Sequence, residues 1–149
     1  MKQIASVKQI NMKKTISKLK KELDTIFSVF IRLRSANEYG MCQCFTCGKV
    51  GHYKTGGMQN GHFQSRKHLA TRFSEDGNCE VQCVGCNIFR SGEQYLFSLR
   101  LDEKYGEGRA EELEHLARTT LKISRAEYED YISYYKNLVE NLKEEKGIE

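Results

Sequence analysis

The first strong hydrophobic pattern of the chain covers residues 14–34. Apolar side chains recur there at steps of three and four positions, the spacing of one face of an amphipathic α-helix. They are Ile16, Leu19, Leu23, Ile26, Phe27, Phe30 and Ile31. Lysines occupy the early polar positions, at Lys14, Lys18, Lys20 and Lys21. The sequence therefore predicts a basic N-terminal helix within residues 1–38, ending in the polar segment 35–40.

A second helical region begins after Gly92. Apolar residues at helical spacing predict one helix up to the glycine-rich break at residues 105–108, and another over residues 113–121. The last helix should begin at a capping box of Ser124 and Glu127. Its apolar stripe contains Tyr128, Tyr131, Ile132, Tyr135, Leu138, Val139 and Leu142. Such a stripe is typical of a core-facing surface, and a contact between two copies of the chain is the alternative.

The segment between these helices has short apolar runs separated by turn residues. Turn signals stand at residues 56–57 and 76–78, and short strands are expected at residues 58–64 and 80–82. A helix should begin near Cys86. The pattern predicts an α+β fold divided into an N-terminal helix (residues 1–38), a small central core (39–108) and a C-terminal helical region (109–149).

Composition limits the size of the core. Of the 149 residues, 39% are hydrophobic and 30% are charged, so binding of a structural metal would add usefully to the folding free energy. The N-terminus is polar and the longest apolar runs are a few residues. We therefore expect no signal peptide, no membrane-spanning segment and a cytoplasmic protein.

Charge is distributed unevenly. Residues 1–90 contain 15 Lys and Arg against 6 Asp and Glu, whereas residues 91–149 contain 9 against 14. A basic half is typical of a surface that binds a polyanion such as DNA. A solvated lysine-rich helix explains the same count, and charge alone leaves both interpretations open.

Two cysteine pairs carry the clearest chemical signal. Cys44 and Cys47, and Cys83 and Cys86, each have the two-residue gap that lets one turn present two thiolates to a single ion. Together they predict one tetrahedral Zn²⁺ site, with buried free thiols as the alternative. Four thiolates leave no open coordination position, so this zinc would be structural.

Three nearby residues are weaker candidates for the same metal. His52 follows the first pair at the spacing of a short zinc knuckle, but the position of the next ligand is Gly57. We therefore expect His52 to be a loop histidine. Cys42 lies too close to Cys44 for the usual turn, and we expect Cys42 and Cys79 to be small buried residues.

The stretch enclosed by the cysteine pairs contains His62 and Asn78, and Asn87 follows it. Hydrolysis of a phosphodiester needs an activated water and a cation that stabilises the transition-state charge. Histidine suits the first task, and amide or carboxylate oxygens suit Mg²⁺ or Mn²⁺. The alternatives are a hydrogen-bonded histidine that supports the zinc loop and, after Asp76 and Gly77, an ordinary turn asparagine.

These residues carry a family resemblance. The first cysteine pair, a histidine on an expected strand and Asn78-x4-Cys83-x2-Cys86-Asn87 resemble the HNH, or ββα-metal, endonucleases. The fuller stretch, with residues 59–66, 72–73, 78–87, 91–92 and 95, is similar to the phage NinG, or Rap, recombination endonucleases. The resemblance covers roughly residues 40–108 and implies a zinc-stapled ββα-metal core of the HNH or treble-clef kind.

The resemblance also implies a function. A phage or prophage protein of this kind would act in the host cytoplasm as a structure-selective endonuclease on branched DNA, such as Holliday junctions and D-loops. By motif position, His62 would be the general base, Asn78 would stabilise the loop that orients it, and Asn87 would bind the catalytic Mg²⁺ or Mn²⁺. A two-fold junction as substrate suggests a homodimer.

The chain departs from the HNH pattern at two positions. Many HNH enzymes have a metal-binding Asp before the catalytic His, and this chain has Gly61; the last motif residue is Asn87 rather than His. Another donor is therefore expected. Asn60 and Gln64 share a strand face with His62, and Glu80 and His68 are further candidates; of these, Asn60 is assigned to the catalytic ion.

Basic and polar residues next to His62 are candidate phosphate contacts: Ser65, Arg66, Lys67, His68 and Arg72. Two other functions stay open. Without an acidic residue at position 61, the chain could be a non-catalytic zinc-finger adaptor that binds nucleic acid. A protein-interaction module organised by the tyrosine-rich last helix agrees less well with the basic half.

Overall fold

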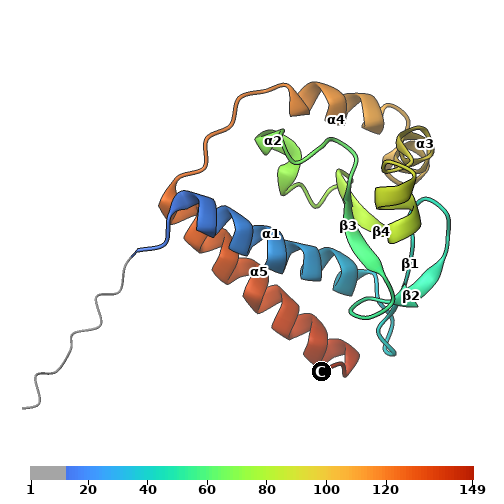
Figure 1. Ribbon diagram of the computed structural model, residues 1–149, viewed down its shortest axis with the longest axis horizontal. Helices are drawn as coiled ribbons and strands as arrows, with labels where there is room; N and C mark the ends of the chain where they lie inside the picture. Colours follow the sequence, from blue (N-terminus) through green and yellow to red (C-terminus); the bar gives the residue numbers. More distant parts are fainter. Residues whose placement is uncertain (1–12) are drawn as a thin grey trace, which may run out of the picture.

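The computed structural model describes residues 13–149. Two long helices, α1 (Ile16–Arg34) and α5 (Arg125–Lys146), lie side by side on one side of the molecule (Figure 1). Both helices and the capping box of α5 confirm the sequence pattern; the Ser124 side chain accepts a hydrogen bond from the Glu127 amide. The first twelve residues of the expected 1–38 region lie outside the described part.

The core between α1 and α5 is aromatic. Phe27 of α1 meets Tyr135 of α5 edge-on, with ring centroids 5.0 Å apart, an arrangement favoured by the ring quadrupoles. The stripe of α5 therefore faces the core, as expected, through Tyr128, Ile132, Tyr135 and Val139. Tyr131 differs, because it is exposed.

The strands form two antiparallel pairs. Strand β1 (Met41–Gln43) pairs with β2 (Val50–His52), and β3 (Met58–His62) pairs with β4 (Cys79–Cys83). Strand β3 ends two residues earlier than the sequence pattern predicts, because the amide of Gln64 donates to the side chain of Asn78 instead of continuing the ladder. Every residue of β4 is buried, since helices cover both faces of this pair.

The second face of the β3–β4 pair is covered by a smaller helical layer (Figure 1). A π-helical turn, η1 (Gly85–Phe89), follows β4, and α3 (Gln94–Tyr105) and α4 (Arg109–Ala117) follow it. The expected break between α3 and α4 is confirmed. Phe97, Leu101 and Leu113 form a second small core. The short helix α2 (Leu69–Arg72) was not expected from the hydrophobic pattern.

The fold is therefore mixed α and β: the β3–β4 pair lies between two helical layers, and the β1–β2 pair lies next to β4. Within residues 13–149, no helix has both the length and the apolar character needed to cross a lipid bilayer. The boundaries of the three expected regions stay predictions.

Candidate metal centre and histidine cleft

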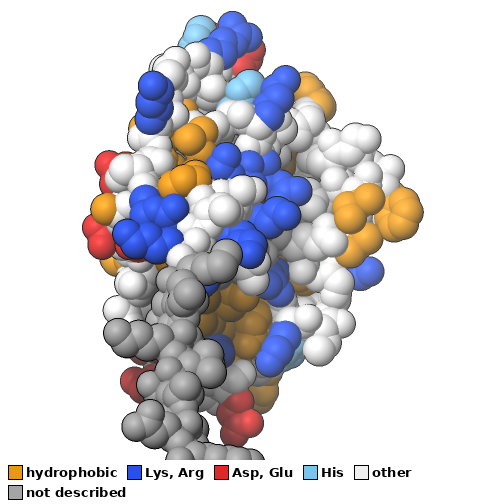
Figure 2. All heavy atoms as spheres, turned by 60° about the vertical axis from the view of Figure 1, so that its left-hand side comes forward, with side chains coloured by type: hydrophobic (Ala, Val, Ile, Leu, Met, Phe, Trp, Pro, Cys, Tyr) orange, Lys and Arg blue, Asp and Glu red, His pale blue; other side chains and the backbone are white. Residues whose placement is uncertain are grey.

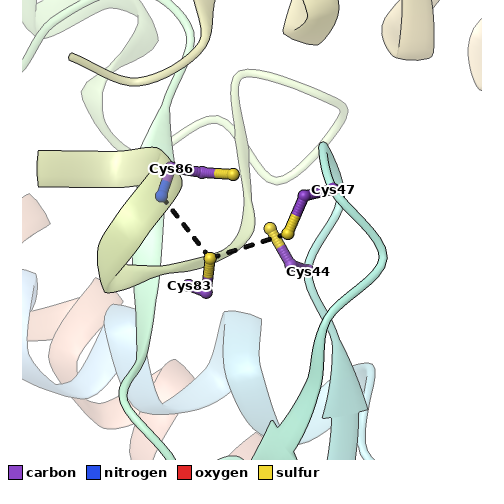
Figure 3. Close-up of side chains that lie close together, drawn as sticks. All are labelled: Cys44, Cys47, Cys83 and Cys86. Carbon is purple, nitrogen blue, oxygen red and sulfur yellow. Dashed lines mark hydrogen bonds between the residues drawn. The ribbon is translucent and has the colours of Figure 1, made fainter. Parts of the chain in front are cut away.

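The four paired cysteines meet at one point. Their sulfur atoms all lie within 4.8 Å of one another, as Figure 3 shows. Cys47 Sγ and Cys83 Sγ are 3.7 Å apart, and a tetrahedron with Zn–S bonds of ~2.3 Å has edges of about 3.8 Å. The predicted convergence of the two pairs is confirmed, and the donor set fits one tetrahedral zinc ion.

Hydrogen-bond donors surround these sulfurs. The Cys86 amide donates to Cys83 Sγ at 3.4 Å, the Lys49 amide donates to Cys47 Sγ at 3.4 Å, and the Arg90 guanidinium donates to Cys86 Sγ at 3.0 Å. Such donors stabilise thiolates, the form that binds metal. Arg90 was not recognised in the sequence, although it stands one helical turn after Cys86.

The weaker metal candidates lie apart from the four sulfurs, as expected. Cys42 and Cys79 are buried, and burial raises the pKa of both thiols, which keeps them neutral. His52 is the last residue of β2 rather than a loop residue, and its Nδ1 accepts from the Lys54 amide at 3.2 Å. Among the described residues, none of the three joins the sulfur cluster.

His62 is the last residue of β3, and one of its ring nitrogens is fixed. Its Nε2 lies 2.9 Å from the backbone oxygen of Arg72. Because a carbonyl oxygen only accepts, Nε2 carries the proton, and Nδ1 of the neutral ring keeps its lone pair. Burial lowers the pKa of His62 below the ordinary value of 6.5, so the ring is neutral at pH 7.

A cleft of about 650 Å³ opens beside His62. Strand alternation places Met58, Asn60 and His62 on one face of β3. This face lies opposite the polar side of α1 across the cleft. The cleft is also lined by Asn87 and Ile88 of η1, by Ser65 and Arg66 of the loop after β3, and by Asp24, Ser28 and Arg32 of α1. The structure thus brings together His62, Asn60 and Asn87.

The two asparagines in the cleft differ in their hydrogen bonds. Asn87 Nδ2 donates to Gln59 Oε1 at 2.8 Å, which orients the amide and leaves its oxygen free of that contact. Asn60 Oδ1 is buried and has no hydrogen-bond partner within residues 13–149. A buried oxygen without a donor is costly in a protein interior, so Asn60 offers an unused acceptor in the cleft.

Helix α1 contributes a carboxylate that the sequence analysis missed. Asp24 receives two hydrogen bonds from Arg72, at 2.9 and 2.5 Å. The only sequence signal was an acidic residue on the basic polar face of this helix. Arg72 therefore joins α1 to α2 through its side chain while its backbone oxygen holds His62.

Asn78 lies outside the cleft. It is fully buried, and its Oδ1 accepts from the Gln64 amide at 2.7 Å. Its Nδ2 donates to the backbone oxygens of Thr71 at 2.8 Å and Gln64 at 3.2 Å. These bonds tie Gln64, just after β3, to Thr71 of α2, and the next residue of α2, Arg72, supplies the oxygen that holds His62.

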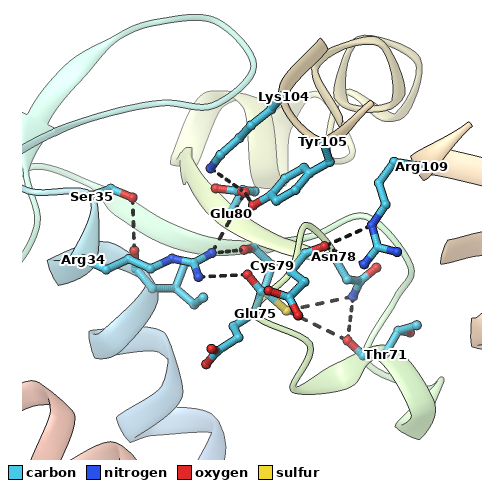
Figure 4. Close-up of polar contacts among 12 residues, drawn as sticks. Arg34, Ser35, Thr71, Glu75, Asn78, Cys79, Glu80, Lys104, Tyr105 and Arg109 are labelled. Carbon is cyan, nitrogen blue, oxygen red and sulfur yellow. Dashed lines mark hydrogen bonds and ion pairs between the residues drawn. The ribbon is translucent and has the colours of Figure 1, made fainter. Parts of the chain in front are cut away.

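Glu80, a candidate second metal donor, is on the other side of the sheet. It pairs with Gly61, whereas His62 pairs with Cys79, so alternation puts Glu80 and His62 on opposite faces. Its carboxylate accepts from Lys104 Nζ at 3.0 Å and Tyr105 OH at 2.5 Å (Figure 4). Gln64 and His68 do not line the cleft either.

Steric crowding explains why position 61 is a glycine. A Cβ atom there would overlap with the side chain of Gln82. Gln82 is itself fixed by donating to Thr46 Oγ1 at 3.1 Å and to the Gly92 oxygen at 2.9 Å. The packing between β4 and η1 therefore leaves no room for the aspartate that many HNH enzymes have here.

The candidate phosphate contacts fall into two groups. Ser65, Arg66 and Lys67 are exposed, and His68 is half-buried at the start of α2. The side chain of Arg72 is only 15% exposed because Asp24 holds it. Figure 2 shows Lys and Arg side chains gathered over the middle of one face of the molecule.

Comparison with known proteins gives one match. The model of the family described as "Bacteriophage Lambda NinG protein" matches residues 2–145. The chain belongs to the NinG family. No curated protein and no solved structure matches it. The resemblance inferred from residues 40–108 is thereby confirmed at the level of the family, and membership extends over nearly the whole chain.

Proposed function

We propose that this NinG-family protein is a metal-dependent DNA endonuclease that hydrolyses phosphodiester bonds in branched recombination intermediates. The observation that carries the proposal is the free Nδ1 of His62 in an open, basic cleft. Its fixed tautomer and lowered pKa are the properties that a general base needs near neutral pH.

In this proposal, His62 removes a proton from the attacking water through Nδ1. The Arg72 oxygen accepts from Nε2 and stabilises the imidazolium that forms. Asn78 acts as a positioning residue, because it ties the end of β3 to α2, the helix whose last residue supplies this oxygen. The base is thus held by the backbone, without a carboxylate partner on its ring.

The oxygens around the cleft suit Mg²⁺ or Mn²⁺. Asn60 Oδ1 has no donor, Asn87 Oδ1 is free of the contact that orients its amide, and Asp24 supplies a carboxylate. Hard divalent ions prefer such oxygen ligands. A bound ion would stabilise the charge that develops on the scissile phosphate. Asp24 takes the place of the aspartate that Gly61 cannot supply.

The remaining features of the proposal concern the substrate. Arg66 and Lys67 are exposed beside the cleft and would contact phosphates, while Arg32 adds positive charge inside it. Selection of Holliday junctions and D-loops, and action as a homodimer in the host cytoplasm, follow from the family resemblance. The zinc holds β4 and η1 in place and takes no part in hydrolysis.

A second candidate is a zinc-stabilised adaptor that binds nucleic acid without cutting it. Glycine at position 61 and the Asp24–Arg72 ion pair favour this alternative, because that pair competes with metal binding. It predicts salt-dependent DNA binding without metal-dependent cleavage.

Cleavage of a synthetic four-way junction with Mg²⁺ or Mn²⁺ distinguishes the two functions. The nuclease should cut the junction, and His62→Ala should slow cutting by roughly 10²- to 10⁴-fold, the usual contribution of a general base. His115→Ala is the matched control, since His115 is exposed on α4 and should be dispensable. Absence of cutting, or equal rates for His62→Ala and the wild type, would rule out the nuclease proposal.

A further inference from the structure

Two adjacent apolar side chains are exposed at the end of η1, and the first of them lines the histidine cleft. Ile88 and Phe89, the last residues of η1, are 56% and 81% exposed. We call them the apolar tip. A single exposed apolar residue is ordinary, but these two are adjacent, and Ile88 together with Asn87 lines the same cleft as His62.

The backbone that carries the apolar tip is unusual. A π-helical turn is a rare element that often marks functional sites. Directly after it, Ser91 and Glu93 have φ angles of 52° and 48°, on either side of Gly92 at 85°. Non-glycine residues with such angles are strained, and strain of this kind is kept where the surrounding structure enforces it.

Several contacts enforce this backbone. The Gly92 amide donates to the Cys86 oxygen at 2.8 Å, and the Gly92 oxygen accepts from the buried side chain of Gln82 at 2.9 Å. Arg90, next to the tip, bonds both Cys86 Sγ and Glu93. The metal centre and β4 therefore hold the apolar tip in a fixed position, which lowers the entropic cost of binding.

We propose that the apolar tip is a stacking surface for an unpaired nucleobase, with Phe89 as the stacking ring. This inference rests on the proposed function, because the phosphate backbone of the same DNA would occupy the neighbouring cleft. In a duplex, bases stack on one another and offer no free face. Only a gap, a branch point or a single strand presents a base that an exposed ring can accept.

Charge favours this occupant over a second copy of the chain. Arg66 and Lys67 are exposed on the loop beside the cleft, and Arg32 lines it. Pairing this surface with itself would bring like charges together, whereas DNA supplies the opposite charge. A tyrosine in the first turn of α3, Tyr95, is 79% exposed and provides another ring on the segment that follows the tip.

Binding measurements on two DNAs test the inference. The full zinc-loaded chain is titrated, without added Mg²⁺ or Mn²⁺, against a labelled duplex with a short single-stranded gap and against the fully paired duplex. Phe89→Ala should weaken binding to gapped DNA by about 5- to 100-fold, the usual effect of losing one stacked base. Its affinity for paired DNA should not change, and Phe89→Trp should retain the preference for the gap.

Tyr134→Ala is the matched control, because Tyr134 is an exposed ring on α5 and should leave both affinities unchanged. Equal loss on both DNAs, or no loss on either, would overturn the inference. The inference would also be overturned if the wild type sediments as a dimer and Phe89→Ala converts that dimer to monomers. If junction cutting needs His62 but not Phe89, the nuclease proposal stands and the stacking inference fails. If the gap preference depends on Phe89 but the protein does not cut, the stacking inference stands and the nuclease proposal fails.

Discussion

The sulfur cluster and the histidine cleft are neighbours in the fold, yet they are built in opposite ways. The cluster joins two local turns, and its four sulfurs are enough for one tetrahedral ion. The cleft draws on α1, β3, η1 and the loop before α2, and it stays open over about 650 Å³. A closed set of thiolates suits a structural ion, whereas an open cleft with unused oxygens suits a reaction with an external molecule.

The two regions also fix their key groups differently. Backbone amides and Arg90 surround the sulfurs, so the cluster is supported from close by along the chain. His62 is held through Arg72, which is held in turn by Asp24 on another helix. Loss of the cluster should therefore destroy the fold, and changes around the cleft should mainly alter activity. Five predictions test this contrast.

The largest effect is expected for Cys83→Ser. Structural zinc contributes an apparent binding free energy of ~10–16 kcal/mol in small zinc domains, and a serine hydroxyl is a poor substitute for a thiolate. We expect loss of bound zinc and of cooperative thermal unfolding, measured by metal analysis and circular dichroism. Cys42→Ala is the control and should retain one zinc per chain. A Cys83→Ser protein with full zinc content would contradict the assignment.

The next effect concerns the pH dependence of junction cutting. Burial lowers the pKa of His62 below 6.5, so the acid-side midpoint of the rate should lie below pH 6.5, and the rate should fall about tenfold per pH unit at still lower pH. A midpoint at or above 6.5 would exclude His62 as the base.

The same pKa shift affects stability. Below pH 6.5 the unfolded chain takes up a proton on this histidine more readily than the folded chain. The contribution of neutral His62 to the free energy of unfolding is therefore present above pH 6.5 and is lost as pH falls through the folded pKa. Denaturation of wild type and His62→Gln between pH 5 and 7 measures it, and the wild type should show the steeper decline.

A smaller effect is expected for Asn78→Ala. The change leaves the half-buried Gln64 amide without its acceptor and removes two donated hydrogen bonds. The free energy of unfolding should fall by about 1–3 kcal/mol, and cutting should slow because the loop that orients His62 loosens. Zinc content should stay at one per chain. An unchanged rate with reduced stability would limit Asn78 to a structural role.

The smallest effect is expected for Arg72→Lys. Lysine keeps the charge but loses the paired hydrogen bonds to Asp24, so we expect a loss of about 1 kcal/mol in stability. The Mg²⁺ concentration needed for half-maximal cutting should change, because Asp24 is released from its partner. Lys67→Ala is the comparison, and it should weaken DNA binding without altering the Mg²⁺ requirement.

The sequence by itself determined the metal centre, the long helices and the identity of the family. Cysteine spacing is a local property, and the periodicity of α1 and α5 reports directly which side of each helix is buried. The convergence of Cys44 and Cys83 required only that the two strands return the chain to one place. The capping box of Ser124 and Glu127 was likewise readable from four residues.

Only the tertiary structure decided how the cleft is completed. Glu80 and Asp24 are both acidic residues within the basic half, and nothing local distinguishes them. Sheet alternation turns Glu80 toward Lys104 and Tyr105, while helix packing brings Asp24 to Arg72 and the cleft. The same holds for Gly61, because the Gln82 side chain that leaves no room for a Cβ there comes from the neighbouring strand. Contacts between distant segments depend on how whole elements pack, and residue spacing does not encode that directly.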